Sequence, residues 1–323
     1  MGPLERLYLF LHRRRFAGRL RDQVRFEGQR VVSVGNLSAG GTGKTPATML
    51  LARHAVRPLV LLRGYRGSAS KEGALVSDGG AGPALDASRV GDEALLFARA
   101  GFPVAIGRDR AALIRRFAAD RDLVLLDDAF QNPSVFHDHE LVLLDARVSP
   151  DHMRLFPFGR FREPLSALER ASTVLFTHCD RITEQEVRAL QTRVETYVRP
   201  DAIFRSRHRA LGLEPELAAG SAVGVFSGIG RADGFHQAVV ALGYRIQAQR
   251  QFKDHHFFTQ RELGDLFERN PELPWVCTAK DFVRLKAGSY PPERLHVLEI
   301  ELEILGDRED GFLERVLGPA RRR

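Results

Sequence analysis

The chain has 323 residues, of which 44% are hydrophobic and 28% charged, and this balance excludes a disordered or fibrous protein. Its formal net charge is +7 and only five of its 48 basic residues are lysines, a pattern that suits phosphate, nucleic acid or an anionic membrane surface without choosing among them. The two cysteines, Cys179 and Cys277, belong to no CxxC pair, so neither a disulfide framework nor a structural metal site is expected.

The first predicted element is an amphipathic helix within residues 1–25. An apolar stripe recurs at helical spacing and arginines follow it: Leu4, Leu7, Tyr8 and Leu11 with Leu9 and Phe10 beside them, then Arg13, Arg14, Arg15, Arg19 and Arg21. This pattern is typical of a helix that lies in a membrane interface and meets anionic headgroups. An ordinary surface helix packed on the domain is the alternative. No stretch approaches the roughly twenty apolar residues that span a bilayer.

From residue 31 onward, short apolar runs alternate with helical patterns. Strands are expected at Val31–Gly35, Leu59–Arg63, Pro103–Ile106, Leu123–Asp127, Leu141–Asp145 and Thr173–Thr177. Helices are expected at Lys44–His54, Asp92–Ala100, Arg110–Ala119 and Glu184–Val198. Continuous apolar strands that alternate with helices predict an α/β domain with a parallel sheet covered on both faces. The stretch Ser68–Ser88 is rich in Gly, Ala and Ser, which indicates a mobile loop or a hairpin.

A second set of elements begins near residue 221. Strands are expected at Ala222–Phe226, Tyr244–Gln249, Trp275–Thr278 and Leu295–Glu299, and helices at Gly234–Leu242, Gln260–Glu268 and Asp281–Lys286. The predicted organisation is therefore a large α/β domain over residues 26–207, a polar linker over 208–220 and a smaller α/β domain over 221–323. Capping boxes at Thr183–Glu186 and Thr259–Glu262 predict where two of the helices begin.

A glycine-rich segment, residues 35–45, lies between the first predicted strand and the first predicted helix of the large domain. Its glycines let backbone N–H groups surround phosphate oxygens at a helix N-terminus, which predicts a nucleoside triphosphate site. Lys44 would reach the β- and γ-phosphates and Thr45 would bind Mg²⁺. Ser38 stands where the strict pattern has glycine, which is acceptable if that residue needs no positive φ. The predicted nucleotide-binding residues are Ser38, Gly40, Gly41, Thr42, Gly43, Lys44 and Thr45.

Asp127 and Asp128 end a predicted strand, at the edge where ligands of open α/β sheets gather. In a chain with a phosphate-binding loop, this is the expected place for the acid that coordinates Mg²⁺. Asp145, which ends the next strand, is a weaker candidate. Three further sites are ambiguous on residue chemistry alone. Taken alone, Asp92 would be assigned as a helix N-cap. Asp254-His255-His256 could be metal ligands, surface residues or a general base, and Arg162-Glu163-Pro164 could be the start of a helix.

Taken together, these segments resemble the lipid A (tetraacyldisaccharide) 4'-kinase family. The matching motifs occur in family order over most of the chain, at Ser33–Pro46, Arg63–Tyr65, Val90–Glu93, Gly107–Arg110, Asp127–Gln131, Gly159–Pro164, Ser227–Gly230, Asp254–His255 and Thr278–Asp281. The resemblance implies a P-loop NTPase-type domain with a smaller α/β domain that closes over the active site. It implies transfer of phosphate from ATP, with Mg²⁺, to the 4'-hydroxyl of tetraacyldisaccharide 1-phosphate. It also implies a monomer held peripherally at the cytoplasmic face of the bacterial inner membrane.

The resemblance assigns roles by position. Asp92 and His255 match the catalytic pair, in which His255 orients Asp92 while Asp92 takes the proton of the sugar hydroxyl; the cleft must close for the two to meet. Asp127, Asp128 and Glu163 match acids around Mg²⁺ and the acceptor. Residues near the substrate or the transferred phosphate are matched by Asn36, Arg63, Tyr65, Arg110, Gln131 and Arg162. Asn132 and Ala279 replace commoner family residues, and the effect of Asn132 on acceptor contacts stays open.

Two other classes of protein are alternatives. A membrane-associated switch or partitioning ATPase has a similar GGTGKT loop, but Ala39 stands where that group has a signature lysine, and such a switch has no need of Asp254-His255. A nucleic-acid-binding ATPase would rest on net charge alone, because no recognition helix or aromatic–basic surface is apparent. No nucleic acid partner is therefore expected.

Overall fold

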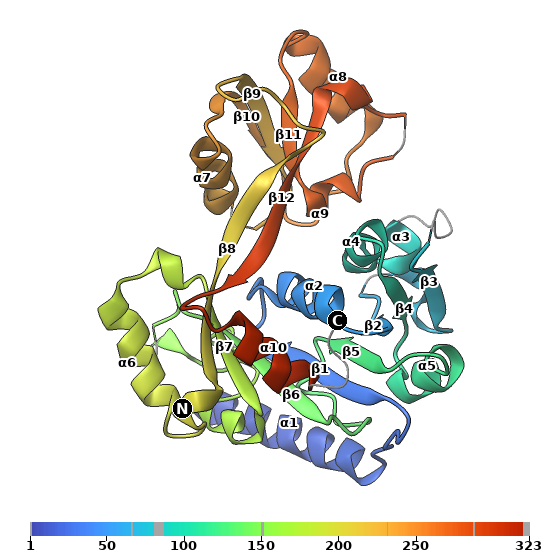
Figure 1. The fold of residues 1–323 in the computed structure, drawn as a ribbon, viewed down its shortest axis with the longest axis vertical. Coiled ribbons are helices and arrows are strands. Elements are labelled where there is room, and N and C mark those ends of the chain that lie inside the picture. The colour runs from blue at the N-terminus through green and yellow to red at the C-terminus, as the bar shows by residue number, and fades with distance from the viewer. Residues whose placement is uncertain are drawn as a thin grey trace.

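The structure is a computed structural model, and it describes residues 2–65, 67–80, 87–149, 152–230, 232–286 and 288–318. The strands form one twelve-stranded sheet in the order β10-β9-β11-β12-β8-β7-β6-β1-β5-β2-β4-β3. Figure 1 shows that the sheet runs through a large part and a small part of the molecule, which two long strands, β8 and β12, connect.

The large part contains seven strands and carries the predicted phosphate-binding loop. The strands are β1 (Arg30–Asn36), β2 (Pro58–Leu62), β3 (Ala74–Asp78), β4 (Pro103–Ile106), β5 (Leu123–Asp127), β6 (His139–Asp145) and β7 (Thr173–Thr177). The α-helices after the first are α2 (Lys44–His54), α3 (Ala87–Val90), α4 (Asp92–Arg99), α5 (Arg110–Phe117) and α6 (Glu184–Val194). All the pairings are parallel except that of β3 with β4.

The buried strands of the large part explain why helices cover the sheet on both faces. Successive residues of a strand point to opposite faces, and β1 is apolar on both. Val31 belongs to an apolar cluster with Ile114 of α5, whereas Val32 belongs to another with Leu51 of α2. The predicted parallel α/β domain is confirmed, and α2, β4, β5 and β7 begin and end at the predicted residues.

The small part repeats the α/β arrangement with fewer elements. Its strands β9 (Ala222–Ser227), β10 (Arg245–Gln251) and β11 (Trp275–Thr278) are parallel, and its helices are α7 (Asp233–Ala241), α8 (Gln260–Arg269) and α9 (Ala279–Phe282). Phe226 and Trp275 are buried at its centre. Both predicted capping boxes are confirmed, at the starts of α6 and α8.

The two parts are joined by an antiparallel pair of long strands, called the ribbon below: β8 (Ile203–Glu214) and β12 (Leu295–Ile304). After the ribbon, α10 (Glu309–Leu317) returns to the large part, where Phe312 packs edge-on against Phe204. The first half of the expected linker 208–220 is therefore strand rather than loop. Arginines of β8 pair with glutamates of β12, as in Arg207–Glu303. Because so many residues of β8 are polar, its sequence resembles that of a linker.

The other differences from the expected elements are local. The stretch Ser68–Ser88 contains strand β3 rather than a hairpin: β3 pairs antiparallel with β4, from which α3 and α4 separate it in the chain, and residues 81–86 lie outside the described residues. The expected helix Asp281–Lys286 instead runs from Ala279 to Phe282, because the Thr278 side chain accepts a hydrogen bond from the backbone N–H of Asp281 and caps it there. Short 3₁₀ turns occur at Ser68–Ser70, Leu165–Arg170, Cys179–Arg181, Pro200–Ala202 and Pro292–Arg294.

Helix α1 (Pro3–Arg21) packs one face on the large part and exposes the other (Figure 1). Leu9 is buried in a cluster that includes Phe130, and Tyr8 stacks on His12. Four apolar side chains on the opposite face are 53–60% exposed: Leu4, Leu7, Phe10 and Leu11. Within the described ranges, no helix combines the length and the apolar content needed to cross a membrane.

Candidate active site

The phosphate-binding loop connects β1 to α2 and is held from both sides. Gly40 and Gly43 have φ of 120° and 86°, which side chains other than glycine rarely adopt. The Asn36 amide donates to the Thr42 hydroxyl at 2.7 Å, and the Thr177 hydroxyl donates to the Thr42 carbonyl at 3.0 Å. Ser38 forms a β-bridge with Phe161 and has no positive φ, so serine is compatible with its conformation.

Four side chains form a charged network beside the loop. Asp128 lies 3.5 Å from the Lys44 amine and 3.0 Å from Arg162. Arg162 also donates to the Gln131 amide oxygen at 3.2 Å, and the Gln131 amide nitrogen donates to the Asn36 carbonyl at 2.8 Å. Burial acts to raise the pKa of Asp128, but Lys44 and Arg162 outweigh it and lower that pKa. The Asp128 carboxylate thus compensates the charge of Lys44 at the place where phosphate would bind.

Asp127 is an incompletely satisfied carboxylate at the end of β5. It is buried beside β1, and one of its oxygens has no hydrogen-bond partner among the residues that the structure describes. Burial, together with the negative charge of Glu93, raises the pKa of Asp127 to about 7. A carboxylate in this situation favours a nearby cation. Thr45 is buried in the first turn of α2, so hydroxyl and carboxylate oxygens suited to Mg²⁺ lie on both sides of the loop.

The structure does not bring Glu163 together with these acids. Its carboxylate lies 2.9 Å from Arg170 and 3.5 Å from His12 of α1, beside a cavity of about 320 Å³ under that helix. Burial acts to raise the pKa of Glu163, but His12 and Arg170 outweigh it and lower that pKa. Within the described ranges, no group of three or more His, Cys, Asp or Glu side chains is arranged to hold a metal ion. The Glu163 carboxylate thus has Arg170 and His12 as partners, and its expected place among the acids around Mg²⁺ stays a prediction.

Asp92 and His255 meet across the two parts of the molecule. Asp92 is the first residue of α4 in the large part, and His255 follows β10 in the small part with φ of 59°. The His255 Nδ1 lies 3.0 Å from the Asp92 Oδ2, and Arg284 contacts the same oxygen at 2.6 Å. Burial acts to raise the pKa of Asp92, but Arg284 and His255 outweigh it and lower that pKa. An ionised carboxylate at neutral pH can accept a proton from an alcohol that is being phosphorylated.

The remaining predicted residues lie after β2 and β4. Arg110 is buried, and its guanidinium donates to the carbonyls of Leu62, at 2.7 Å, and Gly107. Burial lowers the pKa of Arg110 to about 10, although Asp127 and Asp128 act in the opposite direction. Arg110 thus fixes two strand ends behind the acids. Arg63 and Tyr65 follow β2 with exposed side chains, where a ligand could reach them.

Two features near the site have no local signal in the sequence. Arg284 comes from the small part and belongs to no predicted motif. His208 lies inside the expected linker, yet a Cβ at Gly43 would be 3.0 Å from its Nε2, so this histidine lies against the phosphate-binding loop. The His208 ring packs edge-on against His178, which lies 3.4 Å from Asp145. Asp145 therefore belongs to this histidine cluster.

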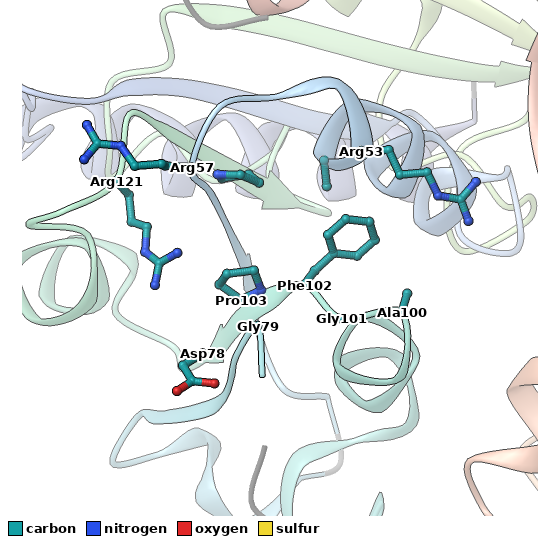
Figure 2. A pocket seen from close by; sticks show the side chains of 11 residues that line it. Arg53, Arg57, Asp78, Gly79, Ala100, Gly101, Phe102, Pro103 and Arg121 are labelled. Carbon is teal, nitrogen blue, oxygen red and sulfur yellow. The ribbon is translucent and has the colours of Figure 1, made fainter. Parts of the chain in front are cut away.

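A cavity of about 510 Å³ lies at the amino ends of strands β2 and β4 (Figure 2). Its lining includes Pro58 and Pro103, which begin β2 and β4, whereas the phosphate-binding loop lies at the carboxyl ends of the strands. Arg57 and Arg121 line this space, and Arg57 pairs with Asp122 at 2.7 Å. The cavity is therefore separate from the candidate active site.

Comparisons with known proteins agree with this geometry. The family described as "LpxK: Tetraacyldisaccharide-1-P 4'-kinase" matches residues 1–318. A tetraacyldisaccharide 4'-kinase of Anaeromyxobacter sp. (strain K) is 36% identical over 91% of this chain and 82% of its own length, and one of Chelativorans sp. (strain BNC1) is 35% identical over 90% and 82%. The crystal structure of "apo" form LpxK from Aquifex aeolicus in complex with ATP has a similar fold, with a TM-score of 0.74 at 24% identity over 97% of this chain and 96% of that one. The chain therefore belongs to the tetraacyldisaccharide-1-P 4'-kinase family.

Proposed function

We propose that this protein transfers the γ-phosphoryl group of ATP to the 4'-hydroxyl of tetraacyldisaccharide 1-phosphate and so makes a bis-phosphorylated lipid A precursor. The observation that carries the proposal is the contact of 3.0 Å between Asp92 and His255. A protein that only hydrolyses ATP needs no alcohol-activating pair contributed by two parts of the chain, whereas a kinase with a sugar acceptor does.

The loop residues and the acids have distinct proposed roles in binding ATP. The backbone from Ser38 to Gly43 would surround the phosphates, and Lys44 would exchange its contact with Asp128 for the β- and γ-phosphates. Thr45, Asp127 and Asp128 would hold Mg²⁺, which supplies neutralisation of the charge on the phosphate oxygens. The bound phosphates would complete the ligand set, since Mg²⁺ usually takes only one or two carboxylates from the protein.

The acceptor would lie between the Asp92–His255 pair and the loop. Asp92 would take the proton of the 4'-hydroxyl, while His255 orients the carboxylate. Arg162 and Gln131, which are linked to each other and through Gln131 to Asn36, would contact the transferred phosphate. The exposed side chains of Arg63 and Tyr65 would contact the substrate, and Arg110 would hold the strand ends behind them.

The outward face of α1 supports a peripheral position on an anionic membrane surface. A lipid substrate must be met at a bilayer, and α1 exposes apolar side chains followed by arginines on the same helix. We propose a monomer at the cytoplasmic face of the bacterial inner membrane, where ATP is present. We propose a helix within residues 1–25, a large domain over 26–207 and a small domain over 221–323, with residues 208–214 belonging to strand β8 of the ribbon rather than to a linker.

The proposal is tested by label transfer from γ-labelled ATP to tetraacyldisaccharide 1-phosphate in mixed micelles with Mg²⁺. We expect labelled lipid from the wild type and none from Lys44→Ala or Asp92→Ala, while Lys71→Ala, a change at an exposed lysine, serves as a matched control. ATP hydrolysis without labelled lipid in the wild type would refute the proposal and favour a switch ATPase. A fully active Asp92→Ala variant would refute the proposed base.

A further inference from the structure

The side chain of Arg284 is a buried cation between the two parts of the molecule. Only 2% of it is exposed, although it follows a four-residue helix at the edge of the small part. Its Nε and Nη2 donate to Asp92 Oδ2 at 3.1 and 2.6 Å, and its Nη1 donates to the Gly228 carbonyl at 3.0 Å. A guanidinium whose donors are used on three sides has a single well-defined orientation.

Asp281 holds Arg284 from the other side. Asp281 is fully buried and lies 3.3 Å from the Arg284 Nη1. Its carboxylate also accepts the Gly228 N–H at 2.9 Å and the Thr278 hydroxyl at 2.7 Å. Two motifs that match the family, Ser227–Gly230 and Thr278–Asp281, had no role assigned from the sequence. These contacts show that residues of both motifs hold Arg284 in place.

Gly228 ties Arg284 to His255. Its carbonyl accepts both the Arg284 Nη1 and the backbone N–H of His255, each at 3.0 Å. A Cβ on Gly228 would be 3.1 Å from the Cβ of His256 and 3.2 Å from the carbonyl of Lys253, so the close approach of this turn favours glycine. The two groups that the small part presents to Asp92 are therefore fixed on one backbone carbonyl.

Both groups bind the same oxygen of Asp92. The His255 Nδ1 and two Arg284 nitrogens converge on Oδ2, whereas Oδ1 accepts the backbone N–H of Glu93 at 3.1 Å. The carboxylate plane is thus set jointly by the large part, through Glu93, and by the small part, through Arg284 and His255. Contact between α4 and α9 accompanies this arrangement (Figure 1).

We propose that Arg284 is a positioning residue for phosphoryl transfer. It orients the Asp92 carboxylate toward the acceptor hydroxyl, and this orientation depends on the contact between the small part and the large part. The inference rests on the proposed function, because it concerns Asp92 as the proton acceptor. In this proposal Arg284 contacts neither ATP nor the acceptor. It acts through Asp92, and the Thr278–Asp281–Gly228 network holds it in place.

The test compares Arg284→Met and Arg284→Lys in the label-transfer assay, with kcat and KM measured separately for ATP and lipid. Methionine keeps length and apolar contacts but removes the donors, so we expect kcat to fall roughly 100-fold, the loss that follows a misplaced catalytic group, with KM for ATP within about threefold. Lysine keeps the charge beside Asp92 and is expected to recover at least about tenfold of that loss.

Arg294→Met is the matched control. Arg294 is another arginine of the small part, and its guanidinium donates to the carbonyls of Phe267, Asn270 and Leu273. Asp92 is not among its hydrogen-bond partners in the part of the chain that the structure describes. We expect this variant to lower the melting temperature and leave kcat within about threefold of wild type. Binding of ATP by calorimetry shows that each variant remains folded.

Three outcomes separate the hypotheses. A kcat of Arg284→Met near that of wild type would overturn the inference alone. An equal loss in Arg284→Met and Arg294→Met, parallel to their melting temperatures, would reduce Arg284 to a structural contact and also overturn it. Absence of labelled lipid from the wild type would overturn the proposed function and the inference with it.

Discussion

Replacement of Leu7, Phe10 and Leu11 by serine would remove the apolar outward face of α1 and leave its packed face intact. These side chains are 54%, 60% and 54% exposed, whereas Leu9 on the packed face is 7% exposed. Because serine at an exposed helical position changes only a few tenths of a kcal/mol through propensity, the folded protein is expected to keep its stability. Any loss of membrane binding therefore reports the outward face itself.

The expected loss follows from the exposed fractions. Complete burial of a leucine or phenylalanine side chain is worth about 1.5–3 kcal/mol, so insertion of a half-exposed one adds about 1 kcal/mol. Three such residues contribute about 3 kcal/mol, which corresponds to roughly 100-fold weaker partitioning into vesicles. The arginines that follow on the helix add an electrostatic attraction that the triple variant retains and that salt weakens.

Cosedimentation with vesicles that contain an anionic phospholipid measures this partitioning directly. Val240→Ser is the control, because Val240 on α7 is 56% exposed but lies in the small part. We expect the control to bind like the wild type. If the triple variant of α1 also bound like the wild type, the outward face would not be the membrane contact, and the alternative of an ordinary surface helix would stand.

Two further predictions concern the phosphate-binding loop and the dependence of stability on pH. Gly43→Ala would place a side chain at a φ of 86°, with its Cβ 3.0 Å from His208 Nε2. Because both effects strain the phosphate-binding loop, ATP affinity measured by calorimetry should fall by roughly tenfold or more. Burial lowers the pKa of His139 from 6.5 to about 4, so the neutral ring stabilises the fold above pH 6.5 and this contribution is lost as the pH falls toward 4. A difference of this size corresponds to about 3 kcal/mol, and urea unfolding across this range should therefore show a smaller loss for His139→Gln than for the wild type. Equal pH dependence of the two proteins would contradict the assignment.

The parts of the site that could be predicted are those whose signal is local. The phosphate-binding loop and Asp127 lie at strand ends that the apolar runs define, and the structure places both where the pattern requires. The contact of Asp92 with His255 joins residues 163 apart, so only resemblance to a family could suggest it. Arg284 is 192 residues from Asp92 and lies in no pattern that residue spacing can reveal.

Two features that the sequence could not reveal have the same physical origin. The linker over 208–220 was expected because β8 is polar, but its arginines pair with glutamates of β12 on the exposed face of the ribbon, as in Arg209–Glu301, while Leu302 and Ile304 of β12 are buried in an apolar cluster. Glu163 was expected near Mg²⁺ or the acceptor because it matches an acid of the resembled family, but His12, 151 positions earlier in the chain, and Arg170 contact its carboxylate. In each case a distant partner decides the role of a charged residue, and sequence spacing cannot supply that partner.

The ribbon explains how the small part can control Asp92 without a flexible linker. Its backbone pairing is interrupted once, where Glu299 lies opposite Gly212 and Ile300 lies opposite Ala210, so one extra residue of β8 forms a bulge. A bulge bends a strand pair and increases its twist, which sets the direction in which the small part leans. At the bulge, the Glu299 side chain pairs at 2.9 Å with Arg99 of α4, the helix that begins at Asp92. The path of the ribbon and the contact with α4 thus act together to bring His255 and Arg284 onto one carboxylate oxygen.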